Sequence, residues 1–345
     1  AANGTAAPAL SAVDFAALGL TGVTVDNLPA VLAAIAAKTD AGTETDSLSE
    51  LQALITAAAA AQVTAINKIA AYAETGLTAP LEADYAAAGV AGVSAANLGA
   101  INDAINSQKG PDTTLGNAND KEGADTTAEV QAIVNAYNVI LGEANDTTSA
   151  AGDTTPDATP AADPSAANYA QIGADIGLAK TDAENLNLLN DIVGGLQTAD
   201  VDTIAEINEL ARIANAIQSV AATGTSTPAL SAADFVKVGL TGVTPENLPA
   251  VLAAIAAKAD SGSETDSLSE LQTLITDAAA AAVVALGDLS SFANANAAGL
   301  AVASGSVPTL ATYVAAGVVG VNANNLDAIN DALASAPVTG AQANT

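Results

Sequence analysis

The residues that this chain lacks exclude several classes of function. Its 345 residues include no cysteine, histidine, methionine or tryptophan. Without cysteine, neither a disulfide nor a thiolate metal site can form. Without histidine, the usual proton shuttle near neutral pH is missing, and a zinc or iron centre would have only carboxylates as ligands. The Ser–His and Cys–His pairs of nucleophilic catalysis are excluded too. We therefore expect neither an enzyme nor a cofactor.

Basic residues are scarce as well. The chain has 8 Lys and Arg against 38 Asp and Glu, a formal net charge of −30, and Arg212 is its single arginine. Nucleic acids and anionic membranes both require clustered basic residues, so we expect neither as a partner. The most apolar window, residues 278–286, is too short to cross a bilayer, and we expect no membrane insertion.

The apolar half of the chain is built from small side chains. Hydrophobic residues make up 50% of the sequence, but only 2% of it is aromatic, and alanine dominates the rest. Small side chains bury little area each, so the core must be thin and formed by closely packed helices.

The sequence repeats itself, which is the mark of a modular architecture. Residues 8–56 and 228–276 are identical at 39 of 49 positions, and three more divergent copies lie around them. We predict an all-α fold, a tandem array of about four and a half small three-helix modules. The predicted boundaries are residues 1–76, 77–150, 151–224, 225–299 and, for the half module, 300–345. The third, divergent module follows a Thr/Pro/Asp-rich linker at 146–164, and residues 109–125 form a second polar linker.

Each module is expected to begin with two short helices. In the first module, one helix runs from Ser11 to Leu18 and Gly19 ends it. The next helix should begin after Asn27, because a cap at Thr24 would place Pro29 where it breaks the helical hydrogen bonds. Asparagine is a good N-cap and recurs at the equivalent positions, Asn97, Asn185, Asn247 and Asn325.

The third helix of each module is predicted to be the longest. Ser47 and Glu50 have capping-box spacing, which recurs at Thr126/Glu129, Thr203/Glu206 and Ser267/Glu270. Neither Gly nor Pro interrupts residues 48–75, so a 28-residue helix of about 42 Å is expected, long enough to pass from one module into the next. Its predicted core face consists of Leu48, Leu51, Ile55, Ala59, Val63, Ile66, Ile69 and Ala73.

Two acidic loops are the only candidate metal sites. Calcium binds six to eight oxygen ligands and accepts such loops. The interpretation we favour is a solvated loop that also caps the third helix, because neither loop has EF-hand or RTX spacing. The candidate ligands are Asp40, Glu44, Asp46, Asp260, Glu264 and Asp266.

The aromatic residues occupy equivalent positions and could form a sugar-binding strip. In a chain short of bulky side chains, we instead interpret them as the residues that fill each core. Five stand in the first helix of a copy, and two more follow a matching leucine by 21 residues. They are Phe15, Tyr85, Tyr169, Phe235 and Tyr313, with Tyr72 and Phe292.

The motif G-hydrophobic-T-G-V-T-x-x-N-L-x-A-[VI], at residues 19–31 and 239–251, is followed by a capped D-[ST]-x-x-E helix. This pattern resembles the GA-like helical repeats of very large bacterial surface proteins and RTX-type adhesins. The resemblance covers nearly the whole chain. It implies an extracellular or cell-surface location, and it transfers no binding residues.

We therefore expect a structural repeat segment of an extracellular bacterial surface protein, such as an adhesin stalk, a fibre, or a filament or surface-layer subunit. Its partners would be neighbouring modules or copies of itself. The alternative is a protein- or glycan-binding helical module of an adhesin, with a host or cell-surface ligand. The chain starts without Met and its final copy is half a unit, so we also expect it to be part of a longer protein.

Overall fold

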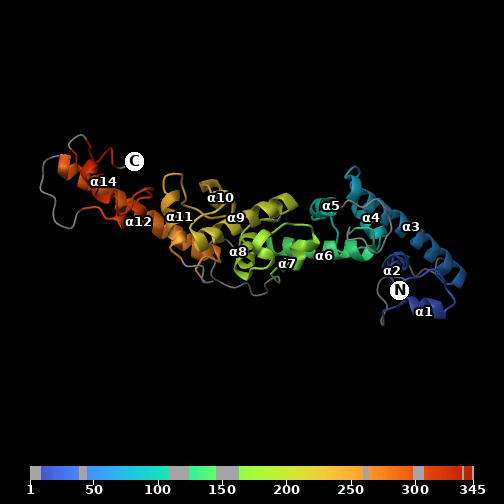
Figure 1. Ribbon diagram of the computed structural model, residues 1–345. Helices are drawn as coiled ribbons and strands as arrows, with labels where there is room; N and C mark the ends of the chain where they lie inside the picture. The colour runs from blue at the N-terminus through green and yellow to red at the C-terminus, as the bar shows by residue number, and fades with distance from the viewer. Residues whose placement is uncertain are drawn as a thin grey trace. The chain divides into compact units, whose positions relative to one another are not determined.

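The computed structural model describes residues 9–38, 45–108, 124–144, 163–258, 264–297, 307–335 and 338–343. These residues form helices joined by loops, without a strand among them (Figure 1). The all-α class is thereby confirmed. The α-helices are α1 Ala12–Ala17, α2 Leu28–Ala36, α3 Leu48–Thr75, α4 Glu82–Ala87, α5 Leu98–Ser107, α6 Thr127–Ala144, α7 Ala166–Gln171, α8 Ala183–Gly194, α9 Ile204–Thr223, α10 Ala232–Lys237, α11 Leu248–Ala256, α12 Leu268–Ala297, α13 Leu310–Ala315 and α14 Leu326–Leu333. Two 3-10 helices are η1 Gly177–Lys180 and η2 Thr198–Asp200.

The chain divides into two compact units. Unit 1 comprises Ala1–Glu143, Ala161–Asp175 and Thr198–Asn208. Unit 2 comprises Ala144–Pro160, Ile176–Gln197 and Glu209–Thr345. The five predicted module boundaries are not tested by this division and stay a prediction. We call the sequence copies repeats 1 to 5, with the boundaries given above. Most of both predicted linkers lies outside the described residues.

In unit 1, the first core forms where α1 and α2 pack on the beginning of α3. Helix α1 starts with a capping box between Ser11 and Asp14 and is followed by Gly19 at φ +79°, as its sequence predicts. The buried residues of this core come from all three helices and one loop. They are Phe15, Leu20, Val31, Ile35, Ile55 and Ala58.

Helix α3 has the predicted length and joins two groups of helices. Ser47 Oγ accepts from the Glu50 amide, the Glu50 carboxylate accepts from the Ser47 amide, and Gly76 closes the helix at φ +67°. Its first half packs on α2, and its second half packs on α4 and α5. Helix α3 therefore contacts short helices of repeat 1 and of repeat 2.

The core face of α3 was predicted partly wrongly. Ala58 and Gln62 are buried in place of Ala59 and Val63, and Val63 is 53% exposed. Leu48 is also exposed, at 56%. The buried side chain of Gln62 explains part of the shift, because its Nε2 donates to Thr127 Oγ1 at 2.8 Å. A polar residue with a buried partner is missed when only apolar spacing is counted.

Four of the predicted asparagines lie at the N-cap position of a second helix, but their side chains form no hydrogen bond with the helix amides. Asn27 Oδ1 accepts from the Thr24 amide at 2.8 Å, and Asn27 Nδ2 donates to Gly22 O at 2.8 Å. The side chain therefore holds the preceding loop closed rather than the helix amides. Asn97, Asn247 and Asn325 make the same two bonds.

Repeat 3 departs from this pattern. Asp182, not Asn185, caps α8, because its Oδ1 accepts from the Glu184 and Asn185 amides. Residues 177–180 form η1 just before it. The four residues that the sequence inserts here move the helix start three residues upstream, and a carboxylate in that position is a strong cap. The prediction for Asn185 is wrong.

Unit 2 repeats the packing of unit 1. Helix α11 packs on the first half of α12, as α2 does on α3. The second half of α12 packs on α13 around Ala285, Leu289, Tyr313 and Ala316, with Leu326 and Ile329 of α14 beside them. Helix α12 therefore also packs on helices of two repeats.

The two long helices are apolar over longer stretches than the sequence analysis predicts. By length and composition alone, α3 and residues 268–295 of α12 could each cross a membrane. A third of each apolar window is buried inside the protein, as in a core helix that packs along one face. The absence of membrane insertion stays a prediction.

Candidate functional site

The aromatic residues of the first helices are buried, as predicted. Phe15, Tyr85, Tyr169, Phe235 and Tyr313 are each at most 4% exposed. A ring with so little exposure has no face left for a sugar. The hydroxyls of two tyrosines also form hydrogen bonds inside the protein. Tyr85 donates to Asn102 Oδ1 at 2.6 Å, and Tyr313 donates to Asn330 Oδ1 at 2.7 Å. These aromatics fill cores.

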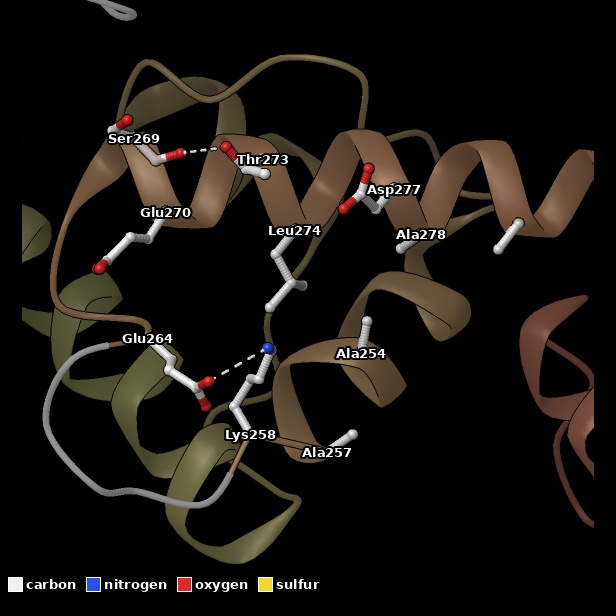
Figure 2. Close-up of a pocket in the computed structure, with 11 residues that line it drawn as sticks. Ala254, Ala257, Lys258, Glu264, Ser269, Glu270, Thr273, Leu274, Asp277 and Ala278 are labelled. Atoms are coloured by element: carbon white, nitrogen blue, oxygen red, sulfur yellow. Dashed lines mark hydrogen bonds and ion pairs between the residues drawn. The ribbon is translucent and has the colours of Figure 1, made fainter. Parts of the chain in front are cut away.

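A groove lies between α11 and α12 of unit 2. It has a volume of about 590 Å³, and Lys258 and Glu264 line one end of it (Figure 2). Alanines form its α11 wall, and Leu274 projects into it from α12. Its lining residues are Ala254, Ala257, Lys258, Glu264, Ser269, Glu270, Thr273, Leu274, Asp277, Ala278 and Ala281.

The charges of this groove are mostly negative and partly neutralised. Lys258 Nζ lies 3.6 Å from Glu264 Oε1 (Figure 2), and both side chains are more than a third exposed. Glu270 and Asp277 supply two further carboxyl groups. Such a lining favours a small cationic or amphipathic group.

The calcium hypothesis finds no cluster of ligands. Among the described residues, no group of three Asp or Glu side chains is placed to hold a metal ion. Glu264 pairs with Lys258, while Asp46 and Asp266 lie beside Glu50 and Glu270. Asp40, Glu44 and Asp260 lie outside the described residues, so the complete loops stay untested.

The acidic pairs at the helix starts perturb each other. The carboxyl of Glu50 raises the pKa of Asp46 by a shared hydrogen bond and by repulsion. Burial, followed by repulsion from Glu206, raises the pKa of Asp202. The Ser47 hydroxyl, in contrast, lowers the pKa of Glu50. These shifts follow from capping boxes that place one carboxylate next to another.

Sequence reasoning missed carboxylates that cap a helix of another repeat. In unit 1, Asp103 Oδ2 of α5 accepts from the Ile204 amide, the first residue of α9, at 2.7 Å. In unit 2, Asp191 of α8 accepts from the Leu268 amide, the first residue of α12. Both follow an asparagine in an Asn-Asp pair, and this recurring pair was the available signal. A carboxylate at a helix N-terminus is stabilised by the amides and the helix dipole.

Base–acid pairs also link a long helix to the first helix of the next repeat. Lys68 of α3 pairs with Asp84 of α4, and Arg212 of α9 pairs with Asp234 of α10. Arg212 additionally pairs with Glu209 in its own helix at 2.7 Å. Two of these three pairs, Lys68–Asp84 and Arg212–Asp234, thus link consecutive repeats.

Comparison with protein-family models, with curated proteins and with solved structures finds no match to this chain. Functional conclusions therefore depend on the packing and the chemistry described above.

Proposed function

We propose that this chain is a structural repeat segment of an extracellular bacterial surface protein, without catalytic activity. The observation that carries the proposal is the sharing of long helices: α3 and α12 each pack on the helices of two consecutive repeats. When each repeat packs only on its neighbours, a protein can become longer by adding repeats, because each added repeat forms the same kind of core.

In this proposal, the repeats are small modules in tandem. Two short helices and the start of a long helix enclose one aromatic residue, as in the core around Phe15. The rest of the long helix then supports the next module. The strongly negative charge would keep a long polymer of such modules soluble.

The location is tested on intact cells of the producing organism. Antibodies against this chain should label unpermeabilised cells, and external protease should remove the signal. A cytosolic protein serves as the control and should stay protected. Labelling that appears only after permeabilisation would contradict a surface location.

The proposed role as a stalk, fibre or layer subunit makes a separate prediction about assembly. If the chain is a spacer, it should sediment as a monomer at high concentration. A filament or surface-layer subunit should instead form higher species that electron microscopy shows as regular polymers. Either result refines the structural role, whereas turnover of a substrate would overturn it.

A second candidate is a binding module, favoured by the groove between α11 and α12. Repeat 1 offers a natural control, because Ala53 and Ala57 replace the groove residues Thr273 and Asp277. A ligand that uses this groove should lose affinity when Asp277 is changed to Ala. Binding that ignores this substitution would exclude the groove.

A further inference from the structure

Repeats 1 and 4 carry the same surface in different surroundings. We define the leading face of repeat 1 as Asp14, Thr45, Leu48, Leu51 and Leu54. Its counterparts in repeat 4 are the identical residues 220 positions later, Asp234, Thr265, Leu268, Leu271 and Leu274. Because the residues are the same, any difference in their burial comes from what covers them.

In repeat 4, residues of α8 and α9 contact Asp234, Thr265 and Leu268 of this surface. Leu268, Leu271 and Leu274 are at most 8% exposed. Gly195, directly after α8, lies so close to Leu268 that a Cβ added there would stand 3.1 Å from its Cδ1. The apolar part of the interface is therefore tightly packed.

Three polar contacts fix the position of that cover. Asp191 accepts from the Leu268 amide, and Arg212 pairs with Asp234. Gln218 Nε2 donates to Thr265 O at 2.9 Å, and the Thr265 hydroxyl bonds back to Gln218 Oε1 at 3.1 Å. Gln218 is 4% exposed and Thr265 6%, so this reciprocal pair is well buried.

In repeat 1, the same residues lack these partners. Leu48 is 56% exposed, and Leu51 and Leu54 are only partly buried. Among the described residues, the side-chain hydrogen bonds given for Asp14 are with Ser11 of its own capping box. Among the described residues, neither Thr45 nor the Leu48 amide has the long-range partner that its counterpart has. Three polar groups and a leucine row are thus presented in the arrangement that repeat 4 uses to bind.

We propose that the leading face of repeat 1 is a docking surface for a helix pair of the α8–α9 kind. The partner would supply a carboxylate that accepts from the Leu48 amide, an arginine that pairs with Asp14 and a glutamine that bonds to Thr45. Small residues at the end of one of its helices would leave room for the Leu48 side chain. This inference concerns how repeats associate, and it holds wherever the protein is located.

The test replaces residues 1–7 by a second copy of residues 163–227, fused directly before Pro8 to give an extended chain. This junction matches the natural one, in which residue 227 precedes Pro228. Circular dichroism first shows whether the added segment is helical. Hydrogen exchange at the Leu48 amide is then compared in the extended and the original chain. We expect exchange to slow by on the order of tenfold or more in the extended chain, because the amide gains a carboxylate partner in a covered site.

Two matched substitutions sharpen the result. Asp191→Ala in the added copy should restore fast exchange at Leu48 alone, whereas Asp191→Ala in the original copy should speed exchange at Leu268 alone. Leu48→Ser should leave the melting temperature of the original chain nearly unchanged and lower that of the extended chain. The proposal is overturned if the added segment is helical and Leu48 exchanges as fast as before.

Discussion

The centre of repeat 1 and the centre of repeat 2 solve the same packing problem with different chemistry. In repeat 1, Phe15 packs near Leu32 in an entirely apolar core. In repeat 2, Tyr85 occupies the equivalent position, and its hydroxyl donates to Asn102, whose Nδ2 donates to Pro80 O at 3.0 Å. Repeat 5 uses Tyr313, Asn330 and Pro308 in the same way.

The two residues change together, and the physical reason is the cost of an unpaired buried polar group. A tyrosine beside Leu32 would bury a hydroxyl without a partner, and an asparagine beside Phe15 would bury an amide. Each mixed pair is therefore unfavourable, while both matched pairs are acceptable. In the sequence, repeat 3 has the matched residues Tyr169 and Asn190, and repeat 4 has Phe235 and Leu252.

The largest expected effect is unfolding at alkaline pH, caused by ionisation of the buried tyrosines. Burial raises the pKa of Tyr85, Tyr169 and Tyr313 above the ordinary value. It does the same for Tyr137 of α6, whose hydroxyl donates to Val201 O at 3.0 Å. A raised folded pKa gives stability that is complete below the unfolded pKa and lost as pH rises above about 10. Tyrosinate absorbance and far-ultraviolet circular dichroism should therefore change together in this range. Ionisation of these tyrosines in a chain that keeps full helicity would contradict their burial.

Next in size is Asn102→Ala. It leaves both the Tyr85 hydroxyl and Pro80 O without a partner in the core, so we expect a loss of about 3 kcal/mol in the free energy of unfolding. Urea denaturation measures the change. Asn102→Leu, which keeps the volume, should cost nearly as much, because the tyrosine hydroxyl stays unpaired. A loss below about 0.5 kcal/mol would show that the pair is not buried as described.

Tyr85→Phe should cost less, about 1–2 kcal/mol, because only Asn102 Oδ1 loses its donor. The double variant Tyr85→Phe/Asn102→Leu converts the centre of repeat 2 to the repeat 1 type. We expect it to be more stable than the sum of the single changes predicts, by about 1 kcal/mol or more. Strict additivity in this double-mutant cycle would show that the two residues do not act as a pair.

The smallest loss of stability is expected when a base–acid pair between repeats is removed. Burial tends to raise the pKa of Asp234, but hydrogen bonds from Ser231 and Arg212 outweigh it and hold the pKa below its ordinary value. This contribution is present above the unfolded pKa and is lost as pH falls below about 4. Arg212→Ala should cost about 1 kcal/mol at neutral pH, less at high salt, and almost nothing once Asp234 is protonated. The same cost at acidic pH would contradict an ionic role.

Local signals in the sequence predicted much of the fold. The capping boxes located the starts of α3, α6, α9 and α12, since a hydroxyl and a glutamate three residues later satisfy two orphan amides. The uninterrupted stretch from Leu48 to Thr75 gave the bounds of α3. Each of these signals acts within a few residues of chain, which is why it can be read without a structure.

Contacts between distant residues could not be predicted in this way. Counting apolar spacing placed Val63 in the core, because nothing local reveals that Gln62 meets Thr127. The roles of Asp103 and Asp191 as caps of distant helices depend on how the repeats pack. The exposure of Leu48 and the burial of Leu268 show the limit most clearly, since identical local sequences have different neighbours.

The claim that matters most is that a shared long helix makes consecutive repeats stabilise each other. Site-resolved hydrogen exchange of the Asn102→Ala variant tests it directly. We expect protection to fall not only around Tyr85 but also at Val31 and Ile55, because α3 belongs to both cores. Unchanged exchange at Val31 and Ile55, with the centre of repeat 2 opened, would show that the repeats are independent and would contradict the account.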